Sequence, residues 1–398
     1  MGKVWAYGSR VLLLALAVSL TACKTSGGNA GSGSATPAGP APVASPAPQP
    51  AVSGGVPAAT TEAFVTNSGA GTIATYTVTD GQLSVTPVST TVTAAQSTPR
   101  WITLNGGFAY VANMGFNDVS TYTINQGVLS AVPVSTTAPI AGTAPNKIIV
   151  NNTGTMAYVA NLAAGDVSAY PIHSDLLATD PVETTAPAQG YDIAGIVLSP
   201  SGQHLYCVYF ISTGTTGDGY VASYAVTNGV PAPMPLSVTA ILPNTNPMGI
   251  AISLSGHHIY VVNTGIGNIA TYAVTGGVLS QQPVATTTPV TGSNPFIDAL
   301  DPTGDYLYVA NQGSGTVASY RITNGLPASV PLSVSRAVAG SGPFGVTVGV
   351  RGRFLYVTCE QGGDVASYAI TNGVLSAQAV SVTRPSPGSV PLWLAAAS

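Results

Sequence analysis

The sequence predicts an all-β fold: a seven-bladed β-propeller in which each blade is a sheet of four antiparallel strands. Three observations support this prediction. A short aromatic strand motif recurs seven times, its spacing is nearly constant, and the segments between the copies are rich in β-branched residues and turn signals. One such repeat cannot bury both faces of its sheet alone, so the repeats are expected to pack around a common axis.

The recurring motif is an aromatic residue followed by Val, a small residue and Asn, as in Tyr110–Asn113. Its last position falls at 67, 113, 161, 209, 263, 311 and 359, so the steps are 46, 48, 48, 54, 48 and 48 residues. Tyr209 and Cys359 replace the Asn in two copies. A period in this range is typical of propeller blades.

Each repeat is expected to supply the other strands of a blade. A strand of period two follows the motif, as in Asp118–Tyr122, and then a hairpin turn such as Asn324-Gly325, a dipeptide that accepts positive φ. An outer strand such as Pro331–Ser335 comes next, and the innermost strand of the following repeat starts near a Pro such as Pro145. The order of strands within a repeat is therefore second, third, outer and inner.

The two chain ends are expected to share one blade. The repeats begin on a motif strand near Ala63 and finish on an inner strand, Pro391–Ala396. Pairing of this C-terminal inner strand with the three N-terminal strands would close the ring. Closure removes open sheet edges, which otherwise favour aggregation.

The chain is expected to divide into residues 1–22, 23–61 and 62–398. Lys3 and Arg10 flank the start of an apolar run, Val11–Leu20, that has the length of a signal-peptide core. The sequence Leu20–Cys23 then resembles the bacterial lipobox, which implies cleavage before Cys23 and acylation of its thiol. An ordinary secretory peptide with an incidental Cys is the alternative.

Residues 23–61 are expected to be a lipidated Cys followed by a disordered linker, because Gly, Ala, Ser and Pro gain too little from burial to offset chain entropy. Lys24 after the Cys resembles the pattern of lipoproteins released to the outer membrane. The sequence thus predicts a protein of the cell envelope that is held by a lipid anchor, and the membrane expected to hold it is the outer one.

Composition narrows the range of partners. The chain has 10 Lys and Arg and 14 Asp and Glu, so only 6% of its residues are charged and its net charge is −4. Such a chain cannot build the cationic track that nucleic acids require. No cofactor or metal site is predicted, and a monomer is expected. Cys207 and Cys359 occupy the same strand in repeats three apart, too far from each other for a disulfide.

The Tyr-Val-x-Asn strands that alternate with Pro-x-Gly turns resemble the YVTN repeat and lactonase-like seven-bladed propellers, roughly over Ala63–Ser398. That resemblance implies either 6-phosphogluconolactonase-like and carboxymuconate-cyclising enzymes or extracellular repeat proteins without known chemistry. The resemblance also implies that enzymes of this kind have a His directly after the inner-strand Pro. Here the residues at that position are Arg100, Asn146, Met248, Phe296, Phe344 and Leu392, with Ala194 in the repeat that lacks the Pro.

Strand order places the loops between second and third strands, together with the connections between blades, at one end of the channel, here called the top. The candidate binding residues there are Arg100, Lys147 and Tyr209, together with Asp218 in the long insertion of the fourth repeat. The candidate catalytic residues are Asp298, Asp192 and Glu360.

Asp298 is the most unusual of these residues, because other repeats place an aliphatic side chain three residues after the inner-strand Pro. A buried carboxylate there would bond to backbone amides, face channel water or titrate as a functional acid.

Two functions follow from the sequence. The first is an exported binding scaffold of the cell envelope, whose hydroxyl- and amide-rich top face would suit glycans, peptides or protein partners. The alternative is a lactonase-like hydrolase of a small cyclic ester, in which Asp298, Asp192 or Glu360 is the base and Arg100 or Lys147 lies near the developing oxyanion. A purely structural envelope protein is the third possibility.

Overall fold

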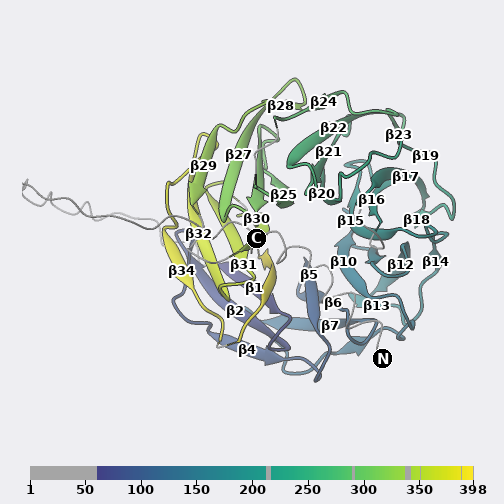
Figure 1. The fold of residues 1–398 in the computed structure, drawn as a ribbon. Coiled ribbons are helices and arrows are strands. Elements are labelled where there is room, and N and C mark those ends of the chain that lie inside the picture. Colours follow the sequence, from purple (N-terminus) through teal and green to yellow (C-terminus); the bar gives the residue numbers. More distant parts are fainter. Residues whose placement is uncertain are drawn as a thin grey trace, which may run out of the picture.

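The computed structural model describes residues 61–211, 217–288, 292–336, 342–349, 351–386 and 388–397. Its strands form seven sheets that are arranged in a ring, which confirms the predicted seven-bladed propeller (Figure 1). Within these ranges no helix is long and apolar enough to span a membrane. The predicted signal segment, Cys23 and all of the linker up to residue 60 lie outside the described residues.

The innermost strands line the central channel, and most begin at the Pro that the sequence marked. They are β5 (Pro99–Asn105), β10 (Pro145–Val150), β15 (Asp192–Leu198), β20 (Pro247–Ile252), β25 (Pro295–Leu300), β30 (Pro343–Val348) and β35 (Pro391–Ala396).

The second strands carry the aromatic motif and are almost completely buried between neighbouring blades. They are β1 (Thr61–Asn67), β6 (Phe108–Asn113), β11 (Met156–Asn161), β16 (His204–Phe210), β21 (His258–Asn263), β26 (Tyr306–Asn311) and β31 (Phe354–Cys359).

The third strands pair with the second strands and are the longest in each blade. They are β2 (Thr72–Thr79), β7 (Asp118–Asn125), β12 (Asp166–His173), β17 (Gly219–Thr227), β22 (Asn268–Thr275), β27 (Thr316–Thr323) and β32 (Asp364–Thr371).

The outermost position of each blade is filled by two short segments, and both of them pair with the third strand. The first segments are β3 (Gln82–Leu83), β8 (Val128–Leu129), β13 (Leu176–Leu177), β18 (Val230–Pro231), β23 (Val278–Leu279), β28 (Leu326–Pro327) and β33 (Val374–Leu375). The second segments are β4 (Ser89–Val92), β9 (Ser135–Thr136), β14 (Glu183–Thr184), β19 (Ser237–Val238), β24 (Ala285–Thr286), β29 (Ser333–Arg336) and β34 (Ser381–Thr383).

In six of the seven blades a Pro lies where this outer strand is split, whereas Ser376–Val380 separates β33 from β34 without a Pro. Pro133, for example, lies between β8 and β9, and Pro331 lies between β28 and β29. A Pro has no N–H to give to the ladder, so pairing stops and resumes after it. The result is a short, interrupted edge, which discourages pairing with another sheet.

The hairpins between third and outer strands have the backbone that their dipeptides predicted. Asn324 and Gly325 have φ values of 53° and 78°, and Asp80 and Gly81 have values of 50° and 78°. Two consecutive residues with positive φ are the mark of the tight turn that matches the twist of adjoining strands.

The motif Asn is structural. Asn113 Nδ2 donates to Asp118 Oδ1 at 2.8 Å and to Ser120 Oγ at 2.8 Å, and Asn161 makes the same two bonds to Asp166 and Ser168. These bonds fix the turn between second and third strands at the top of the blade. Cys207 and Cys359 are both buried and no disulfide joins them, which agrees with the prediction.

Pairing of the two ends of the described chain closes the ring. β35 runs antiparallel to β1, with Ala63 opposite Ala396 and Val65 opposite Leu394. The backbone N–H of Trp393 also donates to Thr66 Oγ1 at 3.2 Å. The seventh sheet is thus built from both ends, as the sequence predicted.

We predict that deletion of residues 390–398 abolishes the cooperative unfolding transition and yields an aggregating product, because the motif strand β1 would lose its inner partner and expose an apolar edge. Size-exclusion chromatography and a thermal melt followed by circular dichroism measure this. The intact chain is the control, and a truncated chain that elutes as a monomer and melts cooperatively would contradict closure by β35.

Candidate functional site

Each inner strand begins with an irregularity that presents one side chain to the top of the channel. The pairing register shifts directly after the Pro, for example between Pro99 and Trp101 and between Pro145 and Lys147. Such a bulge inserts an extra residue and re-aims its side chain. The residues in this position are Arg100, Asn146, Ala194, Met248, Phe296, Phe344 and Leu392.

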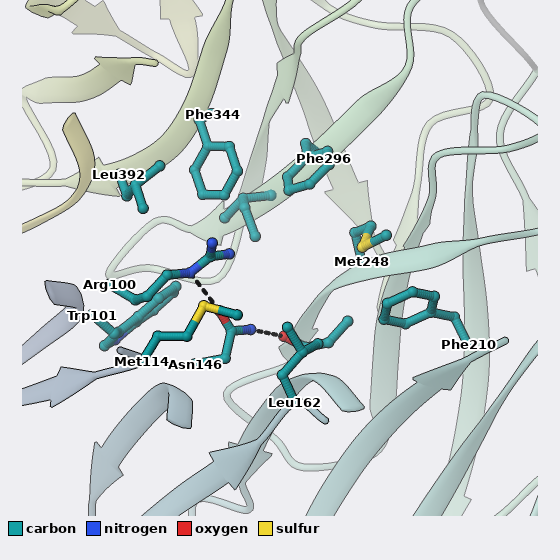
Figure 2. A pocket seen from close by; sticks show the side chains of 12 residues that line it. Arg100, Trp101, Met114, Asn146, Leu162, Phe210, Met248, Phe296, Phe344 and Leu392 are labelled. Atoms are coloured by element: carbon teal, nitrogen blue, oxygen red, sulfur yellow. Dashed lines mark hydrogen bonds between the residues drawn. The ribbon is translucent and has the colours of Figure 1, made fainter. Parts of the chain in front are cut away.

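These seven side chains surround a pocket at the channel mouth, which Figure 2 shows from close by. The wall also includes Met114, Leu162 and Phe210, which lie at the ends of motif strands. Trp101 and Ile297, the residues directly after Arg100 and Phe296 in the inner strands β5 and β25, line it as well. The volume of the pocket is about 40 Å³. Most of the lining side chains are apolar, so the wall of the pocket is mainly hydrocarbon. The sequence had instead predicted a polar top face.

The apolar character of the pocket is visible in the sequence, at the residue that directly follows the inner-strand Pro in each repeat. Met248, Phe296, Phe344 and Leu392 are only 3–9% exposed, and the rings of Phe296 and Phe344 lie 4.7 Å apart between centroids. A search of this position for His alone overlooks the large apolar side chains that four successive blades supply there. Apolar groups that converge on an opening are the ordinary lining of a small-molecule site.

Arg100 is the cationic member of the lining, and its neighbours hold it in place. Its Nε donates to Asn146 Oδ1 at 3.1 Å, and Asn146 Nδ2 donates to the carbonyl oxygen of Ala194 at 3.0 Å. Thr66 Oγ1 donates to the Arg100 carbonyl oxygen at 2.9 Å. Figure 2 shows the guanidinium directed into the pocket and the hydrogen bond that joins it to Asn146.

Glu360 lies at the same end of the channel and balances this charge. It directly follows β31, is 8% exposed, and its Oε2 accepts a hydrogen bond from Gln312 Nε2 at 3.0 Å. Burial raises the pKa of Glu360, and the Arg100 charge and the Gln312 bond oppose that shift. Burial likewise lowers the pKa of Arg100, while the charge of Glu360 opposes this. The two groups therefore stabilise each other's ionised form.

A second pair of opposite charges involves Lys147 and Asp298. The Lys147 Nζ lies 4.8 Å from the centroid of the Trp101 ring, which stacks on Trp393 with 3.4 Å between centroids. Asp298 is 8% exposed, and neither carboxylate oxygen has a hydrogen-bond partner of good geometry among the described residues. A Cβ at Gly249 would lie 2.7 Å from Asp298 Oδ1, so Gly249 provides the space for this carboxylate.

Burial dominates the titration of this pair. It raises the pKa of Asp298 and lowers the pKa of Lys147, and each group's charge counteracts part of the other's shift. The backbone N–H of Asp298 makes only the smallest contribution to the pKa of its carboxyl group. Neither residue belongs to the lining of the mouth pocket.

The other three candidates are not among the residues that line the pocket. Tyr209 lies in the core with 0% exposure, and its hydroxyl is 2.9 Å from that of Tyr224. Asp218 Oδ1 accepts a hydrogen bond from the Asn244 backbone N–H at 3.0 Å, which ties the insertion to the next loop. Asp192 is buried at the start of β15, opposite Phe210. In the described part of the chain, no group of three or more His, Cys, Asp and Glu could hold a metal ion.

Comparisons with known proteins agree with this architecture. A family model described as a lactonase, 7-bladed beta-propeller, matches residues 58–195 and 189–396. No curated protein matches the chain.

Solved structures of the same shape come from several bacteria. A periplasmic gluconolactonase from Pseudomonas aeruginosa is similar with a TM-score of 0.69 and 18% identity, over 85% of this chain and 99% of that one. A protein from Bacteroides fragilis described as a candidate 6-phosphogluconolactonase has a TM-score of 0.69 and 17% identity over 85% and 98%. A protein from Lactobacillus plantarum has a TM-score of 0.68 and 19% identity over 85% and 100%. At these identities the likeness concerns the fold.

We predict that Asp298→Asn makes folding stability less dependent on pH in the acidic range. Because the pKa of Asp298 is raised in the folded state, its contribution to stability is complete below the usual value of 3.8 and is lost as the pH rises towards the folded pKa. Between pH 4 and 7 the variant should lose less stability than the parent, by about 1 kcal/mol or more, since a pKa that differs by one between folded and unfolded states changes stability by roughly 1.4 kcal/mol.

Urea unfolding at several pH values measures this difference. Asp80→Asn is the matched control, because Asp80 is exposed in a hairpin turn whose positive φ other repeats build with Asn. If the stability of Asp298→Asn follows the parent at every pH, Asp298 is not the buried acid described here.

Proposed function

The chain belongs to the lactonase family of seven-bladed β-propellers, and we propose that it hydrolyses a small cyclic ester at the channel mouth. The observation that carries this proposal is the apolar pocket at the channel mouth that Arg100 lines, with the carboxylate of Glu360 outside the lining but near enough for its charge to oppose the lowering of the Arg100 pKa. Two structural neighbours, a gluconolactonase and a candidate 6-phosphogluconolactonase, support the same reaction class.

Arg100 would stabilise the charge that develops on the carbonyl oxygen. When water attacks a lactone carbonyl, that oxygen becomes an oxyanion, and a fixed cation in a pocket with few waters stabilises it strongly. Asn146 holds the guanidinium in position before the reaction, because its amide bonds to both Arg100 and the backbone of Ala194. Little reorganisation is then needed when the charge forms.

Glu360 would act as the general base. Its carboxylate takes a proton from the attacking water, the tetrahedral intermediate collapses, and the ring oxygen leaves as an alcohol after it gains that proton. Gln312 donates a hydrogen bond to the carboxylate and orients it, and burial raises the pKa of Glu360, which makes its carboxylate a stronger base. This role falls to Glu360 because none of the seven residues after the bulge is a His.

We predict that Arg100→Met lowers kcat for lactone hydrolysis by about 10²–10³, the usual effect of removing one oxyanion donor. Glu360→Gln should lower it by roughly 10²–10⁴. The kcat/KM of the parent should rise with pH through the raised pKa of Glu360, because the base must be ionised. A pH-stat assay over a panel of lactones measures these values.

Arg321→Ala, at an exposed position of β27, is the matched control and should leave activity unchanged. Full activity in both Arg100→Met and Glu360→Gln would contradict the mechanism. If no lactone in the panel is hydrolysed, the enzyme proposal fails.

We also propose that the protein is held at the cell envelope through Cys23. The apolar run Val11–Leu20 and the Leu20–Cys23 motif support this, and the periplasmic neighbour from Pseudomonas aeruginosa acts in a compatible compartment. More than one acyl chain is needed for stable anchoring, and acylated N-terminal cysteines usually carry several.

We predict that Cys23→Ser moves the protein from the membrane fraction to the soluble fraction of a Gram-negative host, because the hydroxyl cannot be acylated as the thiol is. Cell fractionation and labelling with a radioactive fatty acid measure this. Ser26→Ala is the control and should stay with the membrane. A Cys23→Ser protein that remains there and takes up the label would refute the anchor.

A binding scaffold is the second candidate, and the pocket itself favours it. A concave apolar site with a single fixed cation binds a ligand whether or not chemistry follows. The lactone panel separates the two functions, because a scaffold would bind a ligand at Arg100 without turnover.

A further inference from the structure

We infer that the mouth pocket takes a small apolar molecule whose polar atoms are all hydrogen-bond acceptors. For the proposed reaction, on which this inference rests, the substrate class is then an alkyl lactone and not a polyhydroxylated sugar lactone. The hydrogen-bonding atoms that the lining side chains leave available decide between the two.

The apolar part of the wall is continuous. Met248, Phe296, Phe344 and Leu392 come from the consecutive inner strands β20, β25, β30 and β35, and they all belong to one hydrophobic cluster. Figure 2 shows these four side chains in an arc around the opening, which begins beside Arg100 at Leu392 and ends across from it at Met248. A ligand must therefore place hydrocarbon against most of the ring.

Among the remaining lining side chains, Arg100 carries only donors and Asn146 carries both a donor and an acceptor. Asn146 Oδ1 already accepts a bond from Arg100 Nε, and its Nδ2 already donates to the Ala194 carbonyl oxygen, so one lone pair and one N–H remain. In the described part of the chain, the terminal nitrogens of Arg100 make no hydrogen bond, so their N–H groups face the pocket. A guanidinium has no acceptor at all.

This excess of donors over acceptors selects between the two kinds of lactone. The carbonyl and ring oxygens of an ester only accept hydrogen bonds, so Arg100 satisfies them. Each hydroxyl of a sugar lactone also carries a donor, and for several such donors the lining side chains offer one oxygen acceptor, the second lone pair of Asn146 Oδ1. A buried polar group without a partner is costly, and that cost repeats for every further hydroxyl.

The size of the pocket fits a small ligand. Its volume of about 40 Å³ corresponds to roughly three water molecules, since each needs about 10–15 Å³ of such space. The end of a short alkyl chain or one side of a small ring fills this space, while the carbonyl meets Arg100. A long polar molecule would remain mostly outside.

Two measurements on the full-length chain test the inference. In the first, kcat/KM is compared for δ-hexalactone and glucono-δ-lactone, and we expect the alkyl lactone to be favoured at least about tenfold. In the second, isothermal titration calorimetry compares cyclohexanecarboxylate with gluconate. Both anions carry one carboxylate for Arg100, so the comparison isolates the body of the ligand, and we expect cyclohexanecarboxylate to bind at least about tenfold more tightly.

Variants of the wall should move this preference. Met248→Gln, a change of similar length, and Phe344→Tyr, which keeps the ring, both add an acceptor to the apolar arc. Each should narrow the ratio of affinities between cyclohexanecarboxylate and gluconate, and the unfolding midpoint of each variant shows that it is folded. Arg100→Met should abolish binding of both carboxylates.

The outcomes distinguish this inference from the proposed reaction. Preference for gluconate and for glucono-δ-lactone would overturn the ligand class and leave lactone hydrolysis standing. Arg100-dependent binding of cyclohexanecarboxylate without hydrolysis of any lactone would sustain the ligand class and overturn the reaction. Equal binding of the two carboxylates that is insensitive to both wall variants would also overturn the ligand class.

Discussion

Closure of the ring by β35 against β1 is the interaction on which the site depends, because every inner strand contributes one side chain to the mouth pocket. Side chains from all seven inner strands form the pocket wall. The wall keeps its shape only while these strands stay in fixed positions around the channel. The pairing of Val65 with Leu394 and the bond from the Trp393 backbone to Thr66 hold the last strand in place. Since Thr66 also bonds to the carbonyl oxygen of Arg100, the closing blade supports the Arg100 side of the mouth directly.

The repeated motif allowed the fold to be predicted from the sequence, but it gave no indication of the pocket. The aromatic motif recurs because the second strand is buried between two blades in every repeat, so selection for packing leaves the same signal seven times. The bulge residue that directly follows the inner-strand Pro does not have the same structural role in every repeat. Each blade supplies a different side chain there, from Arg100 to Leu392, and the meaning of these positions emerges only when all seven are seen around one opening.

The single candidate residues show why the rest could not be predicted. Arg100 and Glu360 were assigned to the top from strand order alone, and the structure brings their charges close enough to affect each other. Tyr209 occupies the last position of the motif, where strand order also points to the top, but its ring turns into the core and bonds to Tyr224. Strand order fixes the height of a residue in the blade, whereas the direction of its side chain depends on neighbours from other repeats.

The distribution of charge sets the channel apart from the rest of a chain that has few ionisable groups. Of the 10 basic and 14 acidic residues, five lie at the mouth or in the strands that line the channel, namely Arg100, Lys147, Asp192, Asp298 and Glu360. Removing a charge from water costs free energy, and an opposite charge recovers only part of it. At the mouth this cost is partly met by fixed hydrogen bonds from Gln312 and to Asn146, which leave Arg100 oriented before any ligand arrives. Because Arg100 is already oriented, it loses little side-chain entropy when an acceptor binds, and little solvent has to be rearranged. One cation is therefore sufficient to hold the acceptor.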